Sequence, residues 1–250
     1  MSNWLFPDRS ESDETADSET ATASDAPDAE PGDVDPDDVD VDPLRPEAVA
    51  PGTNVLVVGP PMTGKRRLLF DLVGGAESRT GAFVTTKKPA DRVAEWFRAS
   101  RPAEEAWDLS FVDATGTGDR IRPSRAGDIA DLRVVSNPGD LTGVGIELTG
   151  ILRGWHHDGV PGPRVGHHSL STHLMYADLR RVYQFCHVVS TRIATVDGVG
   201  VFTLDVTARG EARDALRQLF DARVEVRENP DGPQFRVRGG DFGPRDWTGF

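Results

Sequence analysis

The chain has 250 residues, of which 41 are Asp or Glu and 28 are Lys or Arg, so its formal net charge is −13. This length allows one sizeable domain with an appendage. The charge is uneven: residues 1–43 hold 15 of the acidic residues and a single basic one, Arg9, and therefore carry −14. The remainder carries +1, so the low isoelectric point belongs to the N-terminal segment. A body of near-zero charge has no clear basic surface, and we expect no nucleic-acid partner.

The N-terminal segment 1–43 is predicted to be a disordered acidic tail. From residue 8 onward it consists almost entirely of Asp, Glu, Ser, Thr, Ala and Pro. Such a segment cannot bury enough apolar surface to offset the entropy lost on ordering. Ahead of it, Trp4, Leu5 and Phe6 form an apolar tip, and the sequence leaves open whether this tip docks on a partner or is a chance of composition.

Targeting and redox signals are absent from the sequence. No apolar run approaches 18 residues and the N-terminus has no signal-peptide pattern, so we expect a soluble, cytoplasmic protein without membrane contact. The single cysteine, Cys186, excludes an internal disulfide, and its apolar neighbours indicate a buried, inert thiol. Three lysines against 25 arginines, with many acidic residues, are typical of a GC-rich genome and a salt-rich cytoplasm.

Strand-like and helix-like segments alternate along the body, which predicts crossover helices on a mostly parallel sheet. We expect strands at 54–59, 81–86, 109–115, 130–136, 163–169 and 198–205, helices at 65–73, 90–100, 140–159, 170–194 and 211–220, and a terminal β-hairpin at 222–239. The predicted architecture is a three-layer α/β domain over residues 44–240, followed by a C-terminal tail, 241–250. Helical periodicity places Trp96 and Ile146 on the buried faces of their helices.

The first strand runs into a sequence that matches the phosphate-loop pattern G-x-x-x-x-G-K. In such a loop, backbone N–H groups enclose phosphates and the lysine reaches the outer ones. The predicted site for ATP or another nucleotide comprises Gly59, Pro60, Pro61, Met62, Thr63, Gly64, Lys65 and the adjoining Arg66.

Arg66 stands where the pattern places a Ser or Thr whose hydroxyl holds Mg²⁺. A guanidinium has no lone pair to offer a metal and adds its own positive charge. The sequence therefore makes Mg²⁺ doubtful as a cofactor. The six histidines likewise show no metal-site spacing, and we assign no metal ligand.

With this loop, "GAFVTTKKPADRV" (81–93) and "RVGHHSLSTHLMYADL" (164–179), the chain resembles the RecA-like ATPases of the KaiC type. It is most similar to KaiC-like proteins of salt-loving archaea, over residues 48–239. The resemblance implies a RecA-like fold and ATP held between the subunits of a homo-oligomer. It thus implies a nucleotide and further protein subunits as binding partners.

The same resemblance marks positions where catalytic groups would stand. In the KaiC type a pair of glutamates that activate water ends the second strand, and here Lys87 and Lys88 occupy those positions. An Asp-Ser pair serves Mg²⁺ at the end of a later strand, and here it reads His168 and Ser169. A lysine of ordinary pKa is a poor general base at neutral pH. With Arg66, these departures leave no residue that we assign a catalytic role.

Three functions remain in order of preference. The first is an ATP-binding, KaiC-like module with lost or weak hydrolysis that acts in regulation or signalling through protein partners. The second is an active ATPase of the same fold completed by oligomerisation, and the third is a DNA-associated, recombinase-like protein. Ser169 and Ser171 are interpreted as helix caps, and Asp205, at a strand end, either faces the pocket or caps a loop. The loop cap is the simpler interpretation.

Overall fold

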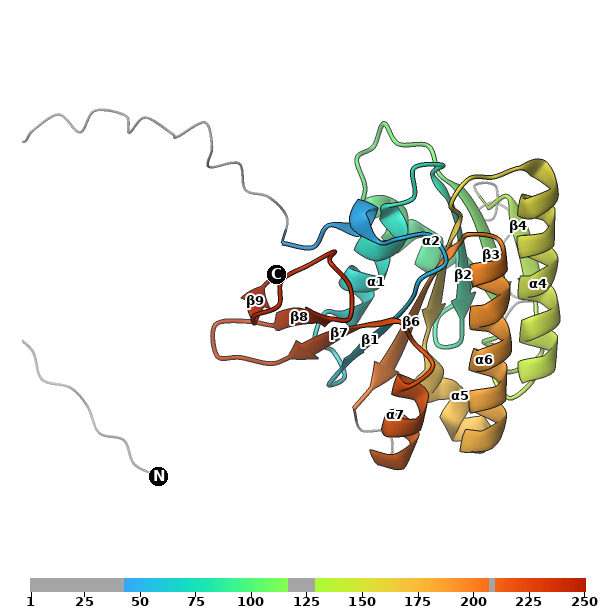
Figure 1. Cartoon of the computed structure of the whole chain (residues 1–250). Coiled ribbons are helices and arrows are strands. Elements are labelled where there is room, and N and C mark those ends of the chain that lie inside the picture. Colours follow the sequence, from blue (N-terminus) through green and yellow to red (C-terminus); the bar gives the residue numbers. More distant parts are fainter. Residues whose placement is uncertain (1–42, 117–128, 207–209) are drawn as a thin grey trace, which may run out of the picture. The chain divides into compact units, whose positions relative to one another are not determined.

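The computed structural model describes residues 43–116, 129–206 and 210–250, without the side chains of 210–213 (Figure 1). Almost all of the expected acidic tail, including Trp4, Leu5 and Phe6, lies outside these residues.

A nine-stranded sheet in the order β4-β3-β2-β5-β6-β1-β7-β8-β9 forms the centre of the described part of the chain (Figure 1). Its strands are β1 (Asn54–Gly59), β2 (Thr80–Thr85), β3 (Asp108–Asp113), β4 (Asp131–Val134), β5 (Arg164–His168), β6 (Val199–Asp205), β7 (Ala222–Arg227), β8 (Gln234–Arg238) and β9 (Thr248–Gly249). Strands β4 to β7 in this order are parallel, and β8 and β9 add antiparallel pairs at one edge. This confirms the predicted α/β class and the C-terminal hairpin.

Helices cover both faces of the sheet because each central strand points alternate side chains to opposite sides. Val55 and Val57 of β1 pack with α1 and α2, whereas Leu56 and Val58 pack with the layer that contains α4, α6 and α7. The helices are α1 (Lys65–Gly74), α2 (Ala90–Ala99), α4 (Leu141–Asp158), α5 (Leu170–Tyr176), α6 (Leu179–Thr195) and α7 (Gly210–Arg217), with a short 3₁₀ helix, η1 (Pro46–Ala48), before β1.

Two helical predictions need correction. The expected single stretch 170–194 is divided into α5 and α6, because Ala177 is extended and Asp178 caps α6 by accepting a hydrogen bond from the Arg181 N–H at 2.9 Å. The interpretation of Ile146 as a buried residue is wrong: it is 64% exposed, since the adjacent positions of α4 face the sheet. Trp96 is only partly buried, at the edge of the core.

The segment 241–250, expected as a tail, contributes to the domain. Phe242 is buried in the same core cluster as Leu44, and β9 pairs with β8. The ring of Phe250 meets that of Phe235 at a centroid distance of 5.3 Å. Both ends of the described domain are therefore held by aromatic packing at the antiparallel edge.

A pair of buried histidines lies between the sheet and the α5–α6 layer. The Pro138 carbonyl can only accept, so Nδ1 of His173 donates to it, which leaves Nε2 of His173 to accept from Nε2 of His167 at 3.0 Å. Nδ1 of His167 is then a buried acceptor that has no hydrogen-bond partner among the described residues. The rings pack against Phe202 and Phe185. This arrangement requires a neutral His173, because its Nε2 accepts, and burial favours the neutral form of His167.

We predict that acid destabilises the fold through its buried histidines. Burial lowers the pKa of His167, of His173 and of His168, the last to about 4. Unfolded histidines titrate near 6.5, so below that pH the unfolded chain binds more protons than the folded one. The contribution of these histidines to the free energy of unfolding is complete above about pH 6.5. It declines as the pH falls, by at most about 1.4 kcal/mol per pH unit for each histidine. Urea unfolding between pH 5 and 7.5 measures it.

The substitution His173→Asn retains an amide donor toward Pro138 and removes one titrating ring, so the decline becomes shallower. His156, which is exposed on α4, provides the control, and His156→Asn leaves the decline unchanged. A free energy that is flat across this pH range in the unmodified protein contradicts the prediction.

Candidate functional site

The glycine loop begins where β1 ends and closes at the first turn of α1. A side chain at Gly59 would collide with the Val226 backbone at 2.8 Å, so the loop leaves the sheet against β7. Gly64 caps α1 in the left-handed region, with φ 83°, which glycine adopts without steric cost. Within the loop, the Thr63 hydroxyl donates to the Pro60 carbonyl at 2.8 Å. The first N–H groups of α1 have no intrahelical acceptors and thus remain for an anion.

An ion cluster of three residues lies directly beside this loop. Nζ of Lys65 is 3.1 Å from one carboxylate oxygen of Asp205, and Nζ of Lys87 is 3.3 Å from the other. Lys65 also donates to the carbonyls of Gly59 (2.9 Å) and Pro60. The side chains of Lys65 and Asp205 are 5% and 15% exposed, so the pair is largely removed from water. The lysine that should reach phosphates is thus held by a carboxylate of the same chain.

The cluster fixes the charge states of its members. Burial by itself raises the pKa of the Asp205 carboxyl, but hydrogen bonding to Lys65 and the charges of Lys65 and Lys87 outweigh it, so its pKa lies below the ordinary value. Burial lowers the pKa of Lys65, and Asp205 partly restores it. Asp205 is therefore ionised at neutral pH and can pair with both lysines.

The Arg66 side chain packs on an aromatic ring and offers no ligand for a metal. Its guanidinium carbon lies 4.1 Å from the centre of the Trp96 ring, a cation–π contact between α1 and α2. Position 66 therefore supplies a positive charge at the rim of the site and no oxygen atom. Trp96, which the sequence placed in an apolar stripe, is the aromatic partner that this arginine requires.

His168 ends β5 as a neutral imidazole. Its pKa is lowered to about 4, first by burial and then by the charge of Lys87, with Asp205 acting in the opposite direction. Nδ1 of His168 is hydrogen-bonded to the Thr203 hydroxyl at 3.0 Å. The ring is thus oriented and uncharged at neutral pH, and it can neither attract phosphate as a cation nor replace a carboxylate.

A cavity of about 640 Å³ connects these groups. Of the predicted site residues, those that line it are Pro61, Met62, Gly64, Lys65, Arg66, Lys87 and His168. Gly59, Pro60 and Thr63 shape the loop without lining the cavity. Lys88 is exposed and lies outside the lining. Four positions depart from the residues that the KaiC resemblance predicts: Arg66, Lys87, Lys88 and His168. The structure brings all of them except Lys88 to this cavity.

Three further residues belong to this site. The sequence left two interpretations of Asp205, a residue facing the pocket or a loop cap. Asp205 lines the cavity and pairs with Lys65, so the first is confirmed and the loop cap is wrong. Its backbone N–H donates at 2.7 Å to the hydroxyl of Ser171, which lies within α5 and not at its N-cap, so Ser171 is no helix cap. Phe250 packs on the loop, since a Cβ at Gly64 would lie 2.8 Å from its ring. An acid at the carboxyl end of a strand was the only signal in the sequence that pointed to Asp205.

Ser169 occupies the N-cap position of α5, but its side chain forms no cap bond. Its hydroxyl is buried and without a hydrogen-bond partner in the described structure. The Ser169 N–H donates instead to the Thr86 hydroxyl at 2.9 Å, which ties the end of β5 to the end of β2. The interpretation of Ser169 as a side-chain cap is therefore wrong.

The residues fit a phosphate better than they fit a magnesium ion. The loop offers backbone N–H groups, and Lys65, Arg66 and Lys87 surround the cavity with positive charge. Oxygen ligands suit Mg²⁺, and the one carboxylate among the cavity-lining residues, Asp205, is paired with two lysines. Across residues 43–116, 129–206 and 210–250, no group of three or more His, Cys, Asp or Glu side chains is arranged to hold a metal.

In the described part of the chain, no helix has the length and apolar character needed to traverse a lipid bilayer. The mostly parallel sheet with an antiparallel edge, and a glycine loop between β1 and α1, give the chain a RecA-like α/β fold. Residues 52–226 match a family of unknown function, DUF7504, and the chain belongs to this family.

Solved structures agree with this fold at low sequence identity. The KaiC-like protein PH0186 of Pyrococcus horikoshii OT3 is 12% identical, with a TM-score of 0.51 over 79% of this chain and 83% of its own. The protein PH0321 of the same organism, described in complex with an unknown peptide, is 11% identical, with a TM-score of 0.57 over 76% and 84%. No curated protein matches the sequence. The solved structures support the predicted KaiC-like, RecA-type fold.

We predict that Asp205 competes with phosphate for Lys65. Removing its charge in Asp205→Asn frees both lysines, so affinity for a nucleoside triphosphate in EDTA should rise severalfold, on the order of 1 kcal/mol. Isothermal titration calorimetry measures this. Asp158→Asn, the same charge change on exposed α4, is the control and leaves affinity unchanged. Loss of binding in Asp205→Asn would instead make the carboxylate part of the binding site.

Proposed function

We propose that the protein is a KaiC-like nucleotide-binding module that holds ATP, or another nucleotide, with little or no hydrolysis. The Lys65–Asp205–Lys87 cluster beside an intact glycine loop carries the proposal. The loop and its lysine are the parts of a phosphate site that bind. Where the KaiC type places its metal and water-activating groups, this chain has positively charged or neutral side chains.

Binding without a metal is the first part of the proposal. A triphosphate brings several negative charges, which a metal ion ordinarily helps to neutralise. Lys65, Arg66 and Lys87 supply fixed positive charges around the cavity in its place. Arg66 would leave its contact with Trp96 or extend from it, since the guanidinium lies at the cavity rim. The nucleotide thus replaces Asp205 as the partner of Lys65.

Weak hydrolysis is the second part. Attack by water needs a group that positions it or accepts its proton. The ammonium of Lys87 is paired with Asp205 and has no acceptor site, and His168, with a pKa of about 4, is a weak base. Asp205 is an acceptor, but its pKa is lowered, and Lys87 would still engage one of its oxygens after a nucleotide takes Lys65. None of these three groups suits the role.

Regulation is the third part. A module that binds nucleotide without consuming it would act through contacts with protein partners or with further copies of itself, in the cytoplasm. PH0321, described in complex with an unknown peptide, offers a precedent within the fold. The composition, rich in acidic residues and poor in lysine, is compatible with a halophilic branch of such proteins. The alternative, an ATPase completed by a neighbouring subunit, would need that subunit to supply the missing carboxylate.

We predict that ATP binds in EDTA with an affinity that Mg²⁺ changes little. Lys65→Ala should weaken binding at least tenfold, because the lysine reaches the outer phosphates. Calorimetric titration with EDTA and then with Mg²⁺ tests the first statement, and steady-state phosphate release tests the absence of turnover. Strictly metal-dependent binding, or phosphate release that vanishes in Lys65→Ala, contradicts the proposal and favours the active ATPase.

A repaired site provides a second test. The triple substitution Arg66→Thr, Lys87→Glu and His168→Asp restores the hydroxyl and two carboxylates that a metal-dependent site requires. ATP binding by this variant should become Mg²⁺-dependent, with phosphate release above that of the unmodified protein. Circular dichroism verifies its fold, and Lys88→Glu alone, outside the cavity, is the control. A folded variant whose binding stays indifferent to Mg²⁺ contradicts the assigned positions.

A further inference from the structure

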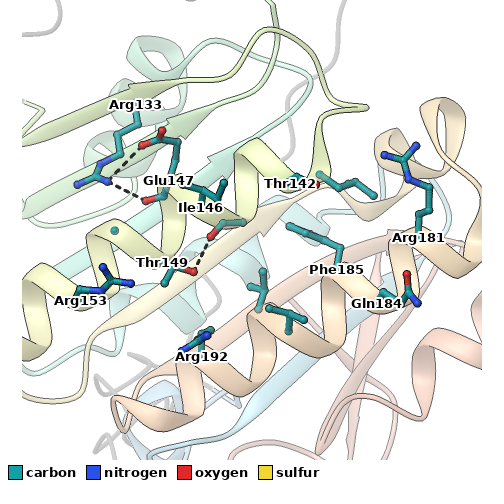
Figure 2. Close-up of a pocket in the computed structure, with 15 residues that line it drawn as sticks. Arg133, Thr142, Ile146, Glu147, Thr149, Arg153, Arg181, Gln184, Phe185 and Arg192 are labelled. Carbon is teal, nitrogen blue, oxygen red and sulfur yellow. Dashed lines mark hydrogen bonds and ion pairs between the residues drawn. The ribbon is translucent and has the colours of Figure 1, made fainter.

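A groove of about 610 Å³ runs between α4 and α6, in the helical layer opposite α1 and α2 (Figure 2). The two helices lie side by side and each presents one face to it. Ile146 comes from α4, and Phe185 and Val188 come from α6. None of these residues belongs to the cavity beside the glycine loop.

The groove exposes apolar side chains on both of its walls. Ile146 is 64% exposed and Val188 is 52% exposed, while Phe185 and Val189 form a buried floor between them. Single exposed apolar residues are common on protein surfaces, but two that face one hollow from different helices form a shared patch. A partner that covered this patch would remove apolar surface from water.

Gly145 lines the groove at a position of α4 where an alanine side chain would also fit, so its missing Cβ makes the groove deeper. A Cβ at Gly145 would lie 3.9 Å from Phe185, an ordinary van der Waals distance, so packing within the domain does not require glycine there. Glycine is a poorer helix former than alanine. The open position at Gly145, in the second turn of α4, therefore leaves room for a side chain from outside.

Positive charge surrounds the apolar floor. Arg153, Arg181 and Arg192 line the groove, and within the described part of the chain none of them forms an ion pair. Arg133, also in the lining, is paired with Asp131 and Glu147. The groove therefore presents three arginines that a negatively charged partner could neutralise.

The spacing of these arginines suits a short helix. Arg181 lies at one end of the groove, and Arg153 and Arg192 lie at the other (Figure 2). At 1.5 Å per residue, the lining stretch of α6 from Arg181 to Arg192 spans roughly 16 Å, about three helical turns. An amphipathic helix of that length would place its apolar stripe on Ile146 and Val188, with acidic groups at both ends.

We propose that the α4–α6 groove binds an acidic amphipathic helix of a protein partner. The inference rests on the proposed function and specifies its partner. Nucleic acid fits less well, since bases would need exposed polar or aromatic groups to contact, whereas Phe185 is buried and the exposed apolar side chains, Ile146 and Val188, are aliphatic. A second copy docking through the same patch would place arginines opposite arginines. Charge complementarity therefore selects an acidic protein segment.

Anisotropy titrations of the full-length protein test the proposal with a stapled, fluorescein-labelled helical peptide. The peptide carries leucines at i, i+3, i+4 and i+7 and glutamates at the other positions. A matched peptide keeps the leucines and carries lysines in place of the glutamates. Only the acidic peptide should bind, although the net charge of the chain, −13, opposes it. The double variant Arg153→Glu, Arg192→Glu and the variant Ile146→Glu should each weaken binding roughly tenfold or more.

Arg180→Glu is the matched control, because Arg180 is exposed on the same helix outside the groove, and its affinity should equal that of the unmodified protein. Circular dichroism verifies that each variant is folded. Equal binding of both peptides, unchanged affinity in the groove variants, or an equal loss in Arg180→Glu overturns the proposal. So does competition by a single-stranded oligonucleotide, or sedimentation that shows the groove residues joining two copies. ATP titration of the same variants separates the two proposals, since intact ATP binding with a failed peptide result rejects the groove alone.

Discussion

The parallel register between β1 and β6 is the constraint on which the site depends. It pairs Gly59, the first residue of the glycine loop, with Asp205, the last residue of β6. Because parallel strands end at the same edge of the sheet, the Asp205 carboxylate comes within 3.1 Å of the Lys65 ammonium. The lysine predicted to bind phosphate thereby acquires an internal partner, and an anion that entered would have to compete with it.

The surroundings of this pair define the balance of charge at the site. Lys87 follows the end of β2, and its ammonium group approaches the second oxygen of Asp205. The guanidinium of Arg66 lies over the Trp96 ring at the rim of the cavity. Fixed cations and backbone N–H groups attract phosphate without a metal, but they provide no acceptor for a proton. Under the proposed function, the same residues that would favour holding a nucleotide would therefore disfavour its hydrolysis, which is why we treat them as one set.

Two adjacent histidines at the end of β5 point to opposite faces of the sheet. Successive residues of a strand point to opposite sides, so His168 faces the cavity of the glycine loop and His167 faces the α5–α6 layer. His167 packs against Phe185, which forms part of the floor of the α4–α6 groove. The cavity beside the glycine loop and the proposed docking groove thus adjoin neighbouring residues of one strand.

Local features of the fold could be predicted from the sequence because short stretches of backbone decide them. The strand at 54–59, the glycine loop and the start of α1 at Lys65 follow from apolar runs and from positions that need glycine. The substitution at Arg66 was equally visible, since the phosphate-loop pattern fixes which residue type should follow the lysine. The division of 170–194 into α5 and α6 was missed, because the cap at Asp178 interrupts an otherwise helical pattern.

Contacts between distant segments were decided only by the tertiary structure. The pairing of Lys65 with Asp205, 140 residues apart, depends on the order and register of strands, which no local pattern encodes. The contact of Arg66 with Trp96 and the exposure of Ile146 likewise depend on how helices pack against their neighbours. The sequence by itself determined a glycine loop that matches the phosphate-loop pattern, with Arg66 in place of the usual Ser or Thr, because that pattern is local to a few residues. Only the fold, by bringing strand ends and helix faces together, decided that an internal carboxylate occupies the lysine and that α4 and α6 leave a groove open.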